Sequence, residues 1–299
     1  MSSAPQRLPA LWASIQHADA IDMACRLTLI LPAVSEWVVG EAWLYKAPLR
    51  VLAIAGLVVP GLHRSRLLWT VLAAIMAAKT LDNWWLQDNH VFLLTYWMIA
   101  LALALHLPAP HQPLRTCARL LVGWAFAFAT LWKVGLSPDF MSGSYFHYTF
   151  VTDARFFDLA EILGGVEPEV LRRNLAAIDR LFTGDTAVAE LGAPMTVGLL
   201  ARCATWWTVG IEAAIAVTFL WPENRGPSRL RDLALLTFGA TTYLVASVWT
   251  FGWTLLTLGM CQVDPARARV RVAYLALLVL VLVYDLVPIG GIAKSLLGG

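Results

Sequence analysis

Residues 116–136 read TCARLLVGWAFAFATLWKVGL, and this stretch decides the fold class. No charged residue stands between Arg119 and Lys133. The hydrocarbon core of a bilayer is roughly 30 Å thick, and a helix needs about 20 predominantly apolar residues to cross it. The stretch therefore predicts one membrane-spanning helix, with a lysine close to one of its ends.

Apolar stretches of the same kind lie on both sides of this one. The further candidate spans are Met23–Trp43, Leu49–Leu62, Leu67–Leu86, His90–Leu107, Thr196–Trp221, Leu233–Gln262 and Val270–Pro288. The stretch 233–262 is too long for one upright helix, and Gly239 and Gly252 are weak points within it. The sequence thus predicts an all-α integral membrane protein, a bundle of eight transmembrane helices, or nine if 233–262 is a broken pair.

The composition agrees with a membrane protein. Of the 299 residues, 59% are hydrophobic and 14% are charged, with a mean hydropathy of +0.66. An ordinary soluble domain is about one-quarter charged, so a soluble enzyme, a disordered protein and a nucleic-acid binder are excluded. The net charge of +2 indicates no polyanionic partner. Because no linker or internal repeat divides the chain, we expect a single membrane domain over residues 1–299.

One long polar segment, Ser137–Pro194, interrupts the apolar stretches. It holds nine acidic and four basic residues, a net charge of −5. Residues 168–183 have the spacing of an amphipathic helix, which either lies on the bilayer surface or packs over the mouth of the bundle. Its apolar positions are Leu171, Leu175, Ile178 and Phe182. We expect 137–194 to form an extramembrane helical cap inserted between two spans.

Basic residues in short loops indicate the orientation, because they stay on the cytoplasmic side. With eight spans, most of the loop arginines fall on one side: Arg64, Arg66, Arg115, Arg119, Arg225, Arg229 and Arg231. The acidic segment 137–194 then faces outward. One loop leaves the span count open, because Arg267, Arg269 and Arg271 lie outside with eight spans and inside with nine.

Two polar clusters interrupt the apolar pattern, and ionisable groups at such places are functional candidates. The first is LDNWWLQDNH at residues 81–90, in which His90 opens a helix. The positive end of a helix suits a histidine for stabilising an oxyanion. The alternative is that Asp88 or Asn89 only caps that helix.

The second cluster is TLWKVGLSPDFMSG at residues 130–143. Desolvation disfavours an ammonium group, so Lys133 in an apolar pocket could be neutral and act as a base. The alternative is that Lys133, close to a helix end, extends to the membrane interface and has no chemical role.

These clusters, in this order, resemble the membrane domain of vitamin K-dependent γ-glutamyl carboxylases and the wider bacterial HTTM (horizontally transferred transmembrane) family. The family carries Asn-His followed by aromatic and leucine residues at the start of a span, and Asn89-His90 matches it. Downstream the family carries a lysine and an Asp-Trp-x-x-Gly turn. Lys133 matches the lysine, and Asp139 to Gly143 match the turn with Phe140 in place of the tryptophan. The family's later span, with a glutamate before apolar residues and a proline, is matched from Glu212.

The resemblance implies a reduced lipid quinone as cofactor, either reduced vitamin K or another menaquinol-type quinol, with no metal. Lys133 would be the catalytic base, and His90 would stabilise the oxygenated intermediate. Substrate-binding residues would include Asn89, Asp139, Gly143 and Glu212. Aromatic side chains could stack on the flat quinone ring: Trp84, Trp85, Tyr96 and Trp132.

Three functions stay open on these observations. The first is a carboxylase-like membrane enzyme, a lyase that uses a quinol and oxygen to modify a peptide or a small acidic substrate. The second is a non-catalytic accessory protein for the maturation or export of a secreted peptide, working with a small partner protein, as a shorter relative in the family does. The third is a carrier or channel, for which we find no supporting inverted repeat. For all three we expect a protein of the bacterial inner membrane, in contact with membrane lipid.

Overall fold

The computed structural model describes residues 18–34, 43–82, 84–223, 225–243, 248–264 and 266–286, and for 284–286 the backbone alone. The regular structure of these residues is entirely helical. This confirms the all-α class that the apolar stretches predict.

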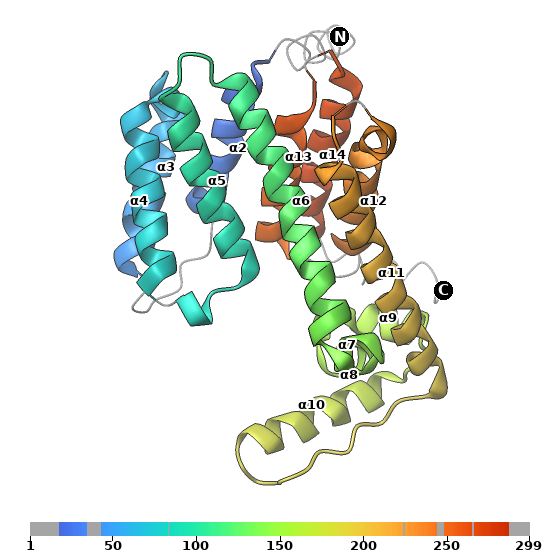
Figure 1. The fold of residues 1–299 in the computed structure, drawn as a ribbon. Coiled ribbons are helices and arrows are strands. Elements are labelled where there is room, and N and C mark those ends of the chain that lie inside the picture. Colours follow the sequence, from blue (N-terminus) through green and yellow to red (C-terminus); the bar gives the residue numbers. More distant parts are fainter. Residues whose placement is uncertain are drawn as a thin grey trace, which may run out of the picture.

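The helices of the bundle lie alongside one another (Figure 1). In chain order they are α2 (Ala20–Val34), α3 (Trp43–Val58), α4 (Arg66–Asp82), α5 (Asn89–Leu105), α6 (His111–Leu136), α11 (Met195–Leu220), α12 (Arg231–Tyr243), α13 (Trp249–Gln262) and α14 (Ala268–Leu286). Short 3-10 helices connect some of them: η2 (Leu62–Arg64), η3 (Trp84–Leu86) and η5 (Gly226–Leu230). Of the candidate spans 23–43 and 270–288, residues 35–42 and 287–288 lie outside the described part of the chain.

The stretch 233–262 forms two helices rather than one. The side chain of Gln262, the last residue of α13, donates a hydrogen bond of 2.6 Å to Asp232 at the start of α12. α12 and α13 are therefore antiparallel. α12 ends at Tyr243 and α13 begins at Trp249, whereas Gly239 and Gly252 lie inside helices. A Cβ at Gly252 would stand 2.8 Å from the ring of Tyr243, so this glycine permits close packing instead of ending a helix.

Two of the described helices, α6 and α11, are long and apolar enough to cross a membrane. The apolar core helix of a soluble protein is mostly buried, but only 22% of the apolar stretch of α6 is buried, and 39% of that of α11. Large apolar side chains on these two helices are exposed: Trp124, Phe128, Leu131, Leu199, Trp206 and Val217. Such a surface fits contact with lipid better than contact with water.

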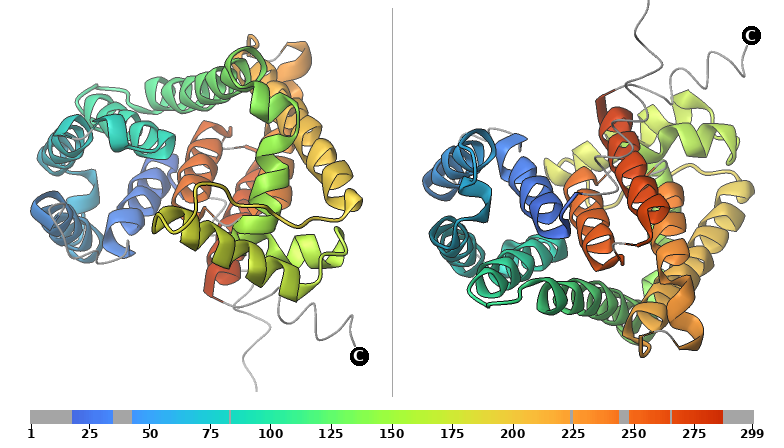
Figure 2. Two further views of the ribbon diagram at one scale, coloured as in Figure 1. Left: turned by 90° about the horizontal axis from the view of Figure 1, so that it is seen from below. Right: turned by 90° about the horizontal axis from the view of Figure 1, so that it is seen from above.

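α13 lies inside the bundle, where it packs against α2, α5, α6, α12 and α14 (Figure 2). Every residue from 252 to 262 is buried. Trp253 Nε1 donates to the backbone oxygen of Leu27 at 2.7 Å, and Trp97 Nε1 donates to Thr28 Oγ1 at 2.8 Å. Buried indole donors are thus satisfied by neighbouring helices, which fixes the position of α2.

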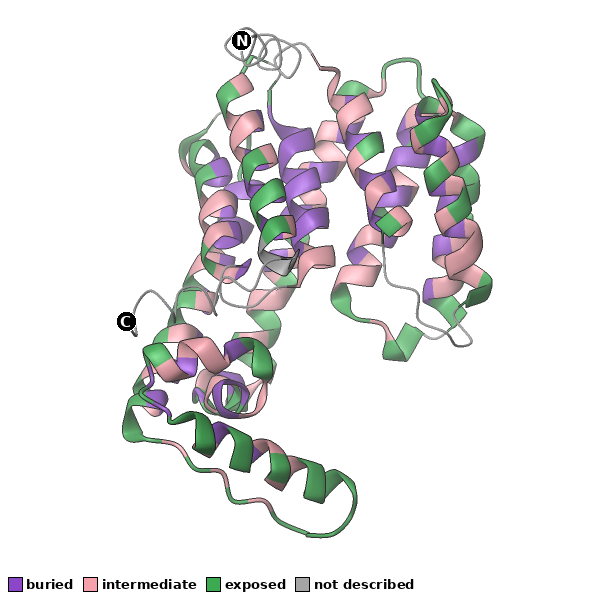
Figure 3. Cartoon of the chain, turned by 180° about the vertical axis from the view of Figure 1, so that it is seen from behind, coloured by how far each residue is buried: buried purple, intermediate pink, exposed green. Residues whose placement is uncertain are grey.

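The segment 137–194 is mostly helical and has an apolar cluster of its own. It comprises α7 (Pro138–Met141), α8 (Ser144–Thr152), η4 (Ala154–Phe156), α9 (Phe157–Ile162) and α10 (Pro168–Phe182). The bounds of α10 agree with the predicted amphipathic helix. Phe150, Phe156 and Leu171 pack with Val197 and Ala201 at the start of α11, and this contact anchors the segment to the bundle. The outer face of α10 is exposed (Figure 3).

The end of the bundle opposite this segment is rich in arginine. Contacts join its loops: Arg64 pairs with Asp19 at 2.7 Å, His111 lies 3.7 Å from the same carboxylate, and Arg115 lies 3.8 Å from Glu223. Since α12 and α13 form an antiparallel pair, the loop after α13 is at this end as well. All the basic loops of the described residues therefore lie at one end.

Candidate functional site

Lys133 near the end of α6 and Glu212 in α11 form a bidentate ion pair. Lys133 Nζ donates to both carboxylate oxygens of Glu212 at 2.7 Å. The two antiparallel helices approach closely at Gly123, where a Cβ would stand 2.7 Å from the side chain of Leu220. From that contact, Lys133 is about 15 Å along α6 and Glu212 about 12 Å back along α11. The helix register therefore brings the two groups to the same height.

This ion pair is shielded from solvent, and more so on the acidic side. The side chain of Glu212 is 8% exposed and that of Lys133 is 21% exposed. Lys133 Nζ also lies 5.3 Å from the centre of the Phe140 ring, a cation–π contact from α7. In such surroundings the removal of either partner leaves the other charge shielded from water and unpaired, which is costly.

Tyr243 at the end of α12 brings a third polar group close to this pair. Its residue is 2% exposed, and its hydroxyl has no hydrogen-bond partner among the described residues. Its ring packs edge-on against Phe238, at 5.9 Å between ring centres, and Phe238 packs against Phe126 of α6 at 4.9 Å.

The position of Tyr243 along the bundle axis can be compared with that of Lys133 from the Phe126–Phe238 contact, because α6 and α12 run in the same direction. Tyr243 is about 7.5 Å further along α12, and Lys133 is about 10.5 Å further along α6. The carboxylate of Glu212 is also near enough to act electrostatically on the Tyr243 hydroxyl. Tyr243 is not among the site residues predicted from the sequence, where its one signal is its position at the end of α12 within the stretch 233–262.

His90, predicted to act with Lys133, has different neighbours. Its ring is 6.5 Å from that of Phe251 on α13, and its Nδ1 is 3.9 Å from the carboxylate of Asp88. Lys79 is its other charged neighbour. α5 begins and α6 ends at the same end of the bundle (Figure 1), but the contacts of His90 and those of Lys133 lead to separate sets of side chains.

The other predicted site residues lie around these two positions. Asn89 is exposed at the start of α5. Four aromatic residues have more than half of their surface exposed: Trp84, Trp85, Tyr96 and Trp132. Trp84 and Trp85 contact each other edge-on, at 6.2 Å between ring centres. These rings lie on the outside of the chain, so the stacking role given to them stays a prediction.

Asp139 and Gly143 build the turn that carries Phe140 to Lys133. Asp139 is exposed in α7. Gly143 has φ +86°, which L side chains rarely adopt, and a Cβ there would stand 3.3 Å from Arg202. A glycine is therefore required at 143 for α7 and α8 to join at this angle.

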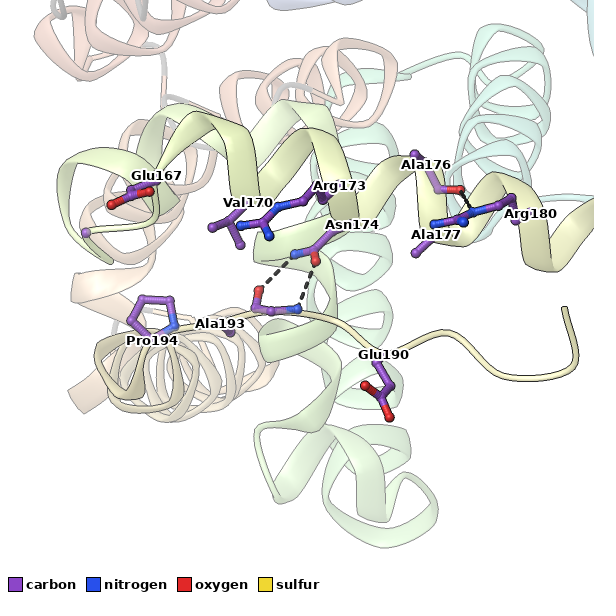
Figure 4. A pocket seen from close by; sticks show the side chains of 12 residues that line it. Glu167, Val170, Arg173, Asn174, Ala176, Ala177, Arg180, Glu190, Ala193 and Pro194 are labelled. Carbon is purple, nitrogen blue, oxygen red and sulfur yellow. Dashed lines mark hydrogen bonds between the residues drawn. The ribbon is translucent and has the colours of Figure 1, made fainter.

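A groove of about 590 Å³ lies in the cap, between α10 and the segment that returns to α11 (Figure 4). Asn174 on α10 holds that returning segment: its side chain donates to the backbone oxygen of Gly192 and accepts from the backbone N–H of Gly192, both at 2.9 Å. Charged side chains of both signs line the groove: Glu167, Arg173, Arg180 and Glu190.

No protein-family model, curated protein or solved structure matches this chain. Within the described ranges, no group of three or more histidine, cysteine, aspartate or glutamate side chains could hold a metal ion. The fold and the site thus define an all-helical protein with two helices suited to a membrane and a shielded lysine–glutamate pair between them.

Proposed function

We propose that this chain is an integral protein of the bacterial inner membrane whose bundle crosses the bilayer with nine helices. The exposed apolar side chains of α6 and α11 support this proposal. The arginine-rich end would face the cytoplasm by the positive-inside rule. The cap, with its net charge of −5, would face outward.

We further propose that the Lys133–Glu212 pair is the proton-transfer site of a quinol-dependent enzyme similar to the vitamin K-dependent carboxylases. One observation carries the proposal: a bidentate ion pair, shielded from solvent, joins the two helices best suited to span the membrane. Ionisable groups at such a depth are retained mainly where they serve a function. The substrate would be a peptide or a small acidic molecule.

The pair gives Lys133 a route to act as a base. In a water-poor site, the ammonium can pass a proton to Glu212, which leaves a neutral amine beside a carboxylic acid. The neutral amine can then accept the proton of a ligand hydroxyl group, and the lysine becomes an ammonium again. Glu212 is thus assigned as the acceptor of the ammonium proton, which frees the Lys133 amine to act as a base. This role is in addition to its predicted role in substrate binding.

The residues at the pair fit a reduced quinone. A hydroquinone has two hydroxyl groups on a flat ring, and the unpartnered hydroxyl of Tyr243 could hydrogen-bond to one of them. Phe140 provides apolar surface close to the amine. When bound, the quinol would supply the reducing equivalents for reaction with oxygen. His90 keeps its assigned role as an electrostatic stabiliser only if the ligand extends toward α5.

The test is formation of quinone epoxide from reduced vitamin K by the full chain in lipid vesicles. We expect Lys133→Ala to abolish turnover and Lys46→Ala to leave it unchanged. Tyr243→Phe keeps the packing against Gly252, and we expect it to raise the KM for the quinol about fivefold or more, the loss of one hydrogen bond.

Three results would contradict this function. If the parent chain forms no epoxide, the quinol is the wrong cofactor. If Lys133→Ala turns over like the parent, Lys133 is not the base. The double variant Lys133→Met/Glu212→Leu removes both charges while keeping the volume, so turnover by that folded protein would exclude proton transfer at the pair.

A second candidate function is favoured by the groove in the cap. Its length along α10 and its charges of both signs suit an extended peptide, as an accessory protein for peptide maturation or export would need. This function predicts a stable complex with a peptide or small partner protein, without quinol turnover and insensitive to Lys133→Ala.

A further inference from the structure

Three arginine side chains from three helices meet at the end of the bundle opposite the cap. They are Arg115 on α6, Arg231 at the start of α12 and Arg271 in the first turn of α14. Arg115 and Arg231 share one partner atom, because their Nη2 atoms lie 3.8 and 3.3 Å from the same oxygen of Glu223. Arg271 adjoins them, with Arg115 and Asp264 among its charged neighbours.

Donors of two of these arginines, Arg231 and Arg271, are poorly satisfied. Arg231 is 8% exposed, and its Nε and Nη1 have no hydrogen-bond partner in the described part of the chain. Arg271 is 1% exposed; its Nη1 donates to the backbone oxygen of Ala18 at 3.1 Å, but its Nη2 has no partner there. A buried N–H group without an acceptor costs about 1–3 kcal/mol, and more when the group is charged.

Neighbouring carboxylates do not make up the deficit. Asp232 is already used: it accepts from Gln262 at 2.6 Å, from Arg267 at 2.6 Å and from Tyr274 at 3.2 Å. Asp19, a further charged neighbour of Arg271, is paired with Arg64 at 2.7 Å. Glu223 accepts from Arg231 Nη2 at 3.3 Å, and both Glu223 and Asp264 lie 3.8 Å from Arg115, beyond hydrogen-bond distance. None of these carboxylates accepts from Arg231 Nε, Arg231 Nη1 or Arg271 Nη2.

We propose that Arg115, Arg231 and Arg271 form a binding site for a phosphate-type oxyanion. Such an anion supplies the missing negative charge and several acceptor oxygens, and the planar guanidinium fork matches it. The site lies at the arginine-rich end, where helix starts and loops meet. An anionic phospholipid headgroup and free inorganic phosphate share this chemistry, and basic pockets between helices at the cytoplasmic surface are suited to the former.

Calorimetric titration of the full chain in a neutral detergent tests the site. The probes are short-chain phosphatidylglycerol, short-chain phosphatidylcholine and inorganic phosphate. We expect phosphatidylglycerol to bind the parent, and Arg231→Gln and Arg271→Gln each to weaken binding at least about tenfold, the loss of one charge-assisted contact. Arg229→Gln removes the same charge from an exposed position of η5, and we expect it to change affinity less than twofold.

The outcomes distinguish a phospholipid headgroup from free phosphate as the ligand, and they show whether the proposal fails. Binding of phosphatidylglycerol without inorganic phosphate identifies a lipid site, and binding of inorganic phosphate identifies a site for the free anion. The proposal is overturned if the parent does not prefer either anion to phosphatidylcholine, or if Arg231→Gln binds like the parent. Should the glutamine variants fail to fold, Arg231→Lys keeps the charge but loses the fork, and unchanged affinity there contradicts the proposal equally.

Discussion

At the scale of single residues, Glu212 and Lys133 depend on each other. Breaking a buried pair leaves one charge without a partner, which costs about 3–5 kcal/mol when both groups are fully buried. Because Lys133 is 21% exposed, we expect Glu212→Gln to lower the free energy of unfolding by a smaller amount, about 2–4 kcal/mol. The double variant Lys133→Met/Glu212→Leu should recover most of this loss. Thermal unfolding in detergent measures both.

Lys46→Met is the matched control. It removes a lysine from α3, a helix that packs against α2 and α4, whereas Glu212 is on α11. We expect its melting temperature to stay close to that of the parent. Equal melting temperatures for Glu212→Gln and the parent would mean that the carboxylate does not hold Lys133, and the site would then lose its geometry.

The sequence predicts the members of this site better than their pairing. Lys133 and Glu212 each stand out as charges within apolar stretches, but they are 79 residues apart. Their contact depends on the register of α6 against α11, which the packing of Leu220 into Gly123 determines. Tyr243 is harder still to predict, because a tyrosine in an apolar stretch is ordinary until its hydroxyl is found without a partner.

At the scale of elements, Asn174 holds the returning segment of the cap, residues 183–194, against α10. It is 3% exposed, and Gly192 relies on it for both backbone hydrogen bonds. We expect Asn174→Ala to detach the segment 183–194 from α10, at a local cost of about 1–3 kcal/mol for the backbone groups left unpaired. Amide hydrogen exchange should rise at Gly192 while α6 and α11 keep their protection. Arg172→Ala, on the exposed side of α10, should leave the exchange unchanged.

The start of η4 should depend on pH through Asp153. Its carboxylate accepts from the backbone N–H and the side chain of Arg155, at 3.0 Å for each, and the Arg155 hydrogen bonds lower its pKa although partial burial opposes them. A lowered pKa in the folded state means that the stabilisation is present above the unfolded value of about 3.9 and is lost as the pH falls below it. Because the pair is partly exposed, the effect should be at most about 1 kcal/mol.

Comparison of the parent with Asp153→Asn isolates this charge, because asparagine can still cap η4. We expect the parent to be the more stable of the two at pH 6 and the difference to shrink steadily as the pH falls below about 4, through the lowered pKa of Asp153. Asp179→Asn, an exposed position of α10, should show no such difference over this pH range. A difference that grows on acidification would mean that the Asp153 carboxylate is destabilising.

The helix pair α12–α13 shows where prediction from hydropathy stops. Hydropathy alone reads 233–262 as one overlong stretch, because the sequence between the two apolar helices holds no charged residue. Gly239 and Gly252 mislead as break points, since both accommodate neighbouring side chains, Leu277 and Tyr243 respectively. The hydrogen bond between the polar residues at the two ends of the pair, Asp232 and Gln262, shows that α12 and α13 are antiparallel. The sequence alone does not indicate this contact.

At the scale of the whole molecule, counting α12 and α13 as two crossings changes the side of the membrane on which the last basic loop would lie. With eight spans, Arg267, Arg269 and Arg271 would lie with the cap, against the positive-inside rule. With α12 and α13 as separate crossings, all the basic loops of the described residues share one side. Of the described helices, five would then cross before the cap and four after it.

Single cysteines test this arrangement in intact cells and in inverted membrane vesicles. We expect a membrane-impermeant thiol reagent to label Leu230→Cys and Ala266→Cys in inverted vesicles only, and Thr186→Cys in the cap from the outside only. All three positions are exposed, and the background should carry Cys203→Ser because Cys203 is exposed as well. Labelling of Ala266→Cys from the same side as Thr186→Cys would instead require an even number of crossings between the cap and α14, so that α12 and α13 count as one. The same experiment places the Arg115–Arg231–Arg271 site on the cytoplasmic leaflet or excludes it from there, because Leu230 adjoins Arg231 and Ala266 precedes α14.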